Sequence, residues 1–93
     1  MINTYRRFNE LKFKALEKFK SHRSIEDQLM YAVIEISMMN ENDVPEHKWE
    51  QVQAIINKCR THKPIGQEGI FRASIDSMTY EGKKTLKEAL ISL

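Results

Sequence analysis

The stretch from Ile25 to Met39 constrains the fold most, because it is apolar on more sides than a surface helix in a short chain requires. At the helical period its apolar side chains fall into two groups. The first face contains Ile25, Leu29, Ala32, Val33, Ile36 and Met39, and the second contains Met30, Tyr31, Ile34 and Met38. A helix of this kind is either enclosed by other helices on both sides or keeps one face for a partner.

The boundaries of this middle helix follow from its flanking residues. Ser24 offers a capping hydroxyl, and Asp27 stands at the third helical position, so we expect the helix to begin at Ile25. The following "NEND" ends it, because Asn and Asp side chains compete for backbone hydrogen bonds.

The rest of the chain is also patterned as helix. Residues 4–22 carry apolar side chains at three- and four-residue steps, and Phe13 falls outside that arc. We expect a neighbouring segment to cover Phe13, with an exposed contact residue as the alternative. Pro45 suits the first turn of the next helix, whose apolar seam is Trp49, Val52, Ile56 and Cys59. Residues 61–69 form a loop, a short helix follows over 70–78, and Thr79 caps a last helix. We therefore predict one all-α domain, residues 1–93, built as a bundle of four to five helices.

Composition places the chain among ordered globular proteins, with 41% hydrophobic and 30% charged residues. The single cysteine, Cys59, excludes an intramolecular disulfide. The charged first twenty residues hold no apolar run typical of a signal peptide or a membrane span, so we expect a cytoplasmic protein without membrane contact.

Charge is segregated along the chain although the net charge is only +2. Residues 1–24 hold seven Lys/Arg against two Glu, residues 25–51 one Lys against seven acids, and residues 52–93 seven Lys/Arg against four acids. This pattern steers a charged partner to one face, or it reflects packing of the basic first helix beside the acidic middle of the same chain.

No pattern typical of catalysis or of a cofactor site is present. Cys59 and His62 stand three residues apart, but two ligands do not make a structural zinc site, and a half-buried cysteine followed by a polar loop histidine explains the pair. Paired carboxylates, a nucleophile elbow and a phosphate-binding loop are all missing. We expect neither an enzyme, nor a metal site, nor a cofactor.

Nucleic-acid binding is one alternative. The loop "IGQEG" has the I-G-x-x-G form of the RNA-binding KH module, but Glu68 repels phosphate and the strands of that module are lacking. A helix-turn-helix reading pairs residues 45–60 with 70–78, where Arg72 is the only evident contact. More basic residues lie in the first helix, where possible nucleic-acid contacts are Arg6, Arg7, Lys14 and Lys18, with Lys12 and Lys20 beside them.

The second face of the middle helix favours protein binding as the function. Thioether side chains adapt to irregular partners, and three of the five methionines are Met30, Met38 and Met39. We therefore predict a partner-binding surface made by Met30, Tyr31, Ile34 and Met38, for a helix of another protein or for a second copy in a homodimer. Enclosure of this face by the first helix is the structural alternative.

The C-terminal half resembles a known family. The run "FRASIDSMTYEGKKTLKEA", especially Phe71-Arg72, Thr79, Glu81 and Lys83 to Leu86, is similar to the AsiA-type anti-sigma factors of bacteriophages. Asp43, Val44, Glu46, Lys48 and Thr61-His62 fall into similar relative places upstream, so the resemblance covers mainly residues 43–89. The chain has a longer basic N-terminal segment than the family, and the sequence stops soon after "KKTLKEA", so we expect the family's last helix to be missing or reduced.

The resemblance implies a small, all-helical, non-enzymatic protein. It implies binding to the bacterial RNA polymerase primary sigma factor at the region that recognises the promoter −35 element, and inhibition of host transcription. In that family the sigma-binding surface lies mainly on the early helices. The best counterpart by order along this chain is 25–39, the stretch with two apolar faces, together with part of the next helix.

Overall fold

The computed structural model describes residues 5–63 and 69–93, and within these it contains five α-helices and one 3-10 turn, without strands. The α-helices are α1 (Arg6–Ser21), α2 (Ile25–Ser37), α3 (Glu46–Lys58), α4 (Ile70–Asp76) and α5 (Tyr80–Ile91), and the turn η1 covers Glu41–Asp43. The predicted all-α class and the number of helices are therefore confirmed.

Local signals in the sequence explain where two of these helices begin. Ser24 Oγ accepts a hydrogen bond from the backbone N–H of Asp27 at 3.1 Å, and Thr79 Oγ1 accepts one from Gly82 N–H at 3.1 Å. Each hydroxyl satisfies a donor that the helix itself leaves unpaired. Pro45 lies just before α3 rather than inside its first turn, and its carbonyl accepts from Lys48 N–H at 2.8 Å. Most of the predicted loop, residues 64–68, lies outside the described residues.

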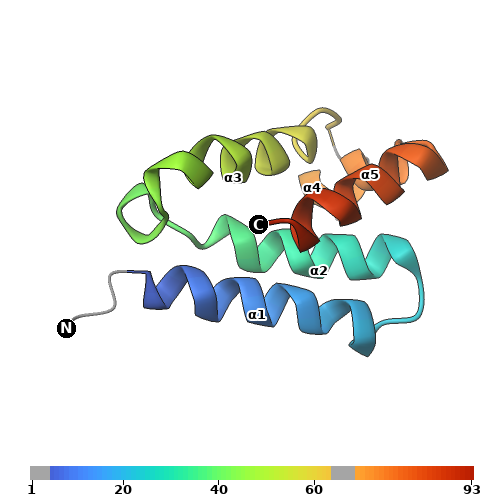
Figure 1. Cartoon of the computed structure of the whole chain (residues 1–93). Helices are drawn as coiled ribbons and strands as arrows, with labels where there is room; N and C mark the ends of the chain where they lie inside the picture. The colour runs from blue at the N-terminus through green and yellow to red at the C-terminus, as the bar shows by residue number, and fades with distance from the viewer. Residues whose placement is uncertain (1–4, 64–68) are drawn as a thin grey trace.

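Helix α2 lies in the middle of the molecule, as Figure 1 shows: α1 runs antiparallel along one side, and α3 and α5 lie on the other. The first predicted face of α2 is core, since Leu29, Val33 and Ile36 are buried completely or nearly so. The buried apolar set also takes residues from α1, α3, α4 and α5: Phe8, Leu11, Ala15, Val52, Ile55, Cys59, Ile75, Leu86 and Leu90.

The basic first helix lies beside the acidic middle helix, as one of the two interpretations of the charge pattern expected, but most ion pairs of α2 form elsewhere. Helix α1 does lie beside α2, but only Lys18 and Glu35 pair across that interface among the described residues, with Nζ and Oε1 3.9 Å apart. The acidic first turn of α2 instead pairs with the basic C-terminal part of the chain: Asp27 with Arg72, and Glu26 with Lys83 at 3.0 Å. These two pairs join α4 and α5 to the start of α2.

Candidate protein-binding surface

Three apolar side chains of α2 point away from the core and form what we call the outer α2 surface: Tyr31, Ile34 and Met38. Tyr31 is 39% exposed and Met38 49%, whereas Ile34 is half-buried. Their spacing of three and four residues places them on one side of the helix, opposite Leu29 and Ile36. The second predicted face is therefore only partly covered within the chain.

Met30, the fourth predicted partner residue, lies in a different environment. It is half-buried and packs against the core cluster. Its position on α2 is turned toward Glu26, which pairs with Lys83 of α5, and away from Met38. The second predicted face thus divides into a packed residue, Met30, and the more accessible outer α2 surface.

The aromatic ring of this surface is held in place by the turn before α2. The rings of His22 and Tyr31 stack with centroids 4.4 Å apart and an interplanar angle of 13°. Gln28 Nε2 also donates a hydrogen bond to the main-chain oxygen of His22 at 2.7 Å. A ring with a fixed orientation loses less conformational entropy when a partner packs on it.

One basic side chain of α1, Lys18, reaches the edge of the outer α2 surface. Glu35, the partner of Lys18, follows Tyr31 by one turn and precedes Met38 by nearly one turn, so Lys18 reaches the edge of the surface. Arg7 and Lys14 precede Lys18 by eleven and four residues, and at the helical period they lie on the same side of α1. Arg6 is paired within its own helix, with Nε 3.0 Å from Glu10 Oε1.

The acidic start of α2 is occupied by partners within the chain. Arg72 binds the carboxylates of both Asp27 and Asp76, and these hydrogen bonds raise the pKa of its guanidinium. The hydrogen bond from Arg72 lowers the pKa of Asp27, and the one from Lys83 lowers the pKa of Glu26. The helix-turn-helix interpretation takes Arg72 as its evident nucleic-acid contact. In this structure Arg72 instead pairs with Asp27 and so joins α4 to α2.

Cys59 and His62 lie in unlike environments. Cys59 is fully buried, and burial raises the pKa of its thiol to about 11, so the reactive thiolate is disfavoured. His62 is exposed, with its Nδ1 3.0 Å from Thr61 Oγ1. Over residues 5–63 and 69–93, no group of three or more His, Cys, Asp or Glu side chains is placed to hold a metal ion.

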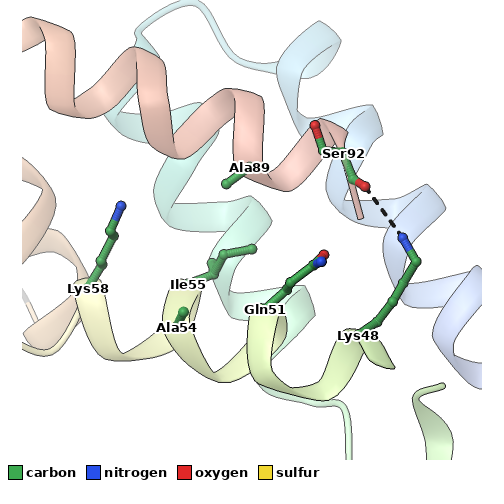
Figure 2. A pocket seen from close by; sticks show the side chains of 7 residues that line it. All are labelled: Lys48, Gln51, Ala54, Ile55, Lys58, Ala89 and Ser92. Carbon is green, nitrogen blue, oxygen red and sulfur yellow. Dashed lines mark hydrogen bonds between the residues drawn. The ribbon is translucent and has the colours of Figure 1, made fainter. Parts of the chain in front are cut away.

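Two hollows open on other parts of the surface. One, of about 410 Å³, lies on α1 beside Phe13, which is 64% exposed and therefore not covered by a neighbouring segment. The other, of about 360 Å³, is a cleft between α3 and α5 (Figure 2). Neither hollow includes a residue of the outer α2 surface.

Comparisons with protein-family models, with curated proteins and with solved structures gave no match for this chain. Among the helices that the structure describes, none is both long and apolar enough to cross a membrane.

Sequence reasoning missed two features of this surface. The edge formed by Lys18 and Glu35 joins two helices, and periodicity within one helix cannot show which rows of neighbouring helices meet. The stack of His22 on Tyr31 depends on the direction of the turn between α1 and α2. A signal for the turn existed in Gln28, whose side chain is long enough to reach back to the preceding carbonyls.

Proposed function

We propose that this protein is a small, non-enzymatic regulator that acts by stoichiometric binding to another protein through the outer α2 surface. The observation that supports this most is the exposure of Tyr31 and Met38 on a helix otherwise packed between α1 and the α3–α5 side. Burying side chains of this size contributes roughly 1.5–3 kcal/mol each, before the costs of ordering. A partner that covers Tyr31 and Met38 gains the share of this free energy that belongs to their still exposed surface, 39% and 49% of each residue.

The resemblance to AsiA-type proteins supports a specific target, the primary sigma factor of bacterial RNA polymerase. On this proposal the protein is a phage inhibitor of host transcription, working in the cytoplasm, and it blocks recognition of the −35 element. Met30 belongs to the predicted surface, but it is half-buried against the core cluster, so less of it is available to a partner.

The direct test is isothermal titration of the protein with a purified bacterial primary sigma factor. Met38→Asp introduces a charge at a 49% exposed position of the outer α2 surface, and Ile91→Asp does the same at a 51% exposed position of α5. We expect Met38→Asp to weaken binding by at least tenfold and Ile91→Asp to leave it unchanged, because only Met38 is covered by the partner.

The same titration can reject the proposal at two levels. If sigma does not bind at all, the target is wrong. If sigma binds and both variants bind as well as the wild type, the outer α2 surface is wrong. Circular dichroism of both variants checks the helical content, and Met38 is a better position for this test than Met30, whose substitution would disturb the core.

Nucleic-acid binding stays as a second proposal, favoured by one observation. Arg7 and Lys14 share a side of α1, and neither forms an ion pair with a carboxylate among the described residues. A gel shift that weakens steeply with salt, and that Arg7→Glu and Lys14→Glu remove, is the expected result. Absence of any shift at low salt would reject this proposal.

A homodimer closed through the outer α2 surface is the third proposal. Light scattering at tens of micromolar protein would show a dimer that Met38→Asp converts to a monomer. A monomeric wild type under these conditions excludes a constitutive dimer and leaves Tyr31 and Met38 for a different partner.

A further inference from the structure

The cleft between α3 and α5 exists because small side chains stand where these two helices face each other. Ala54 of α3 and Ala89 of α5 line it, and Ile55, which is almost completely buried, lies between them at its base (Figure 2). Alanine leaves the space between the helices unfilled. The volume of about 360 Å³ falls at the lower end of the range of roughly 300–1,000 Å³ found for small-molecule sites.

The charged side chains that line this cleft are both cations. Lys48 and Lys58 stand at opposite ends of the row that α3 contributes, as Figure 2 shows, with Gln51 and Ser92 as the polar residues. Ten residues of helix separate the two lysines, or about 15 Å along the axis. The cleft thus has apolar side chains at its centre and a lysine at each end. This arrangement fits an apolar molecule that carries an anionic group.

The two lysines differ in how much of their charge is available. Lys48 Nζ donates to the main-chain oxygen of Leu93 at 2.5 Å and to that of Ser92 at 3.5 Å, so it is committed to holding the end of α5. Burial, and to a lesser extent the nearby charge of Lys48, lower the pKa of Lys12, so a second lysine lies near this end of the cleft. Lys58 is exposed, and its Nζ has no hydrogen-bond or ion-pair partner among the described residues.

We propose that this cleft binds a small amphipathic carboxylate, with its apolar body against Ala54, Ile55 and Ala89 and its carboxylate paired with Lys58. The site is separate from the outer α2 surface, so it is independent of the proposed protein partner. A carboxylate at Lys58 gains an opposite charge, whereas an ammonium group at the same place meets only cations in the lining of the cleft.

The test is a nuclear magnetic resonance titration of the full chain with octanoate, read at the methyl signals of Ala54, Ile55 and Ala89. Octylammonium, which has the same chain and the opposite charge, is the matched probe. We expect saturable shifts of these methyl signals with octanoate, and binding of octylammonium that is weaker by at least the factor that Lys58→Gln costs octanoate. Lys58→Gln should weaken octanoate binding about two- to fivefold, as for a partly exposed ion pair, while Lys84→Gln on the far side of α5 should not.

A second variant tests the apolar part of the site. Ala54→Leu fills the cleft from an exposed position of α3, so the fold is retained and octanoate binding should be lost, whereas Asn57→Leu, outside the cleft, should bind normally. The proposal is overturned if octanoate causes no saturable shift at millimolar concentration, if octylammonium binds equally well, or if only a short acidic peptide binds. It is also overturned if octanoate still saturates Ala54→Leu with wild-type affinity.

Discussion

The imidazole of His22 lies nearly parallel to the phenol ring of Tyr31, with ring centroids 4.4 Å apart. His22 directly follows α1, and Tyr31 lies in the second turn of α2, so the stack crosses the turn between the two helices. The main chain of His22 is held as well, by the hydrogen bond from Gln28 Nε2. One residue thus fixes both the path of the turn and the orientation of an exposed aromatic ring.

We therefore predict that His22→Ala lowers the free energy of unfolding by about 0.5–1 kcal/mol, the range of an exposed aromatic pair. Urea denaturation measures this loss, and Arg23→Ala, at an exposed neighbouring position, is the control. The ring protons of His22 should resonate upfield in the wild type, because they lie over the phenol ring, and should return to ordinary values in Tyr31→Leu. Ordinary values in the wild type would contradict the stack.

A second prediction concerns Ser74, a polar residue that is only 1% exposed. Its Oγ accepts hydrogen bonds from the backbone N–H groups of Thr61 at 3.0 Å and His62 at 3.1 Å, so α4 holds the chain that leaves α3. Ser74→Ala removes the acceptor of both donors and should lower the free energy of unfolding by about 1–3 kcal/mol in urea.

Ser77 supplies the matched control for this serine. Its hydroxyl donates to the main-chain oxygen of Ala73 at 2.9 Å from an exposed position, within one turn of α4. Ser77→Ala should therefore change stability by less than about 0.5 kcal/mol. Equal losses of unfolding free energy in Ser74→Ala and Ser77→Ala would show that the two hydrogen bonds to Ser74 stabilise the fold no more than a hydroxyl bonded within its own helix does.

The sequence was sufficient to predict those parts of the fold that depend on neighbouring residues. Ser24 and Thr79 mark the starts of α2 and α5 because a cap acts within its own first turn. The face of α2 that carries Leu29 and Ile36 was predicted as core because periodicity in one helix shows which residues share a side. Both signals are local.

Features that depend on several helices were less predictable. Periodicity placed Ile56 on the seam of α3, but Ile55 is the residue that is almost fully buried, because α3 meets α2 and α5 together. The expectation that a neighbouring segment covers Phe13 was wrong, since Phe13 is exposed on α1. Whether the second face of α2 was covered could not be read from α2 alone, since it depends on where α1 and α4 lie.

Stability in acid should depend on the two ion pairs at the start of α2. Hydrogen bonds from Arg72 and Lys83 lower the pKa of Asp27 and Glu26 below their ordinary values near 4. A carboxyl whose pKa is lower in the folded than in the unfolded state stabilises the fold above the unfolded pKa, and this contribution is lost as pH falls through the folded pKa. We therefore expect the free energy of unfolding to decrease as pH falls below about 4–5.

Neutral variants test the origin of this acid dependence. Asp27→Asn combined with Glu26→Gln should lower the free energy of unfolding at pH 7, as measured by urea denaturation. The dependence of this free energy on pH should be flatter between about pH 5 and 2. Glu50→Gln, an exposed position of α3 without an ion pair among the described residues, is the control. An unchanged slope in the double variant would mean that other carboxyls carry the acid response.

Cys59 should be unreactive in the folded protein and should make the fold less stable in alkali. Its side chain is fully buried at the end of α3, and burial raises the pKa of the thiol to about 11, above the ordinary value near 8.5. The unfolded chain therefore loses this proton first as pH rises, which lowers the free energy of unfolding between about pH 8.5 and 11.

At pH 8, Ellman's reagent should label the folded protein at least a hundredfold more slowly than the urea-unfolded protein. Cys59→Ala should remove the alkaline part of the pH dependence that comes from the thiol, although the lost volume also lowers stability at every pH. Labelling of the folded protein as fast as that of the unfolded chain would place Cys59 at the surface and contradict this packing of α3.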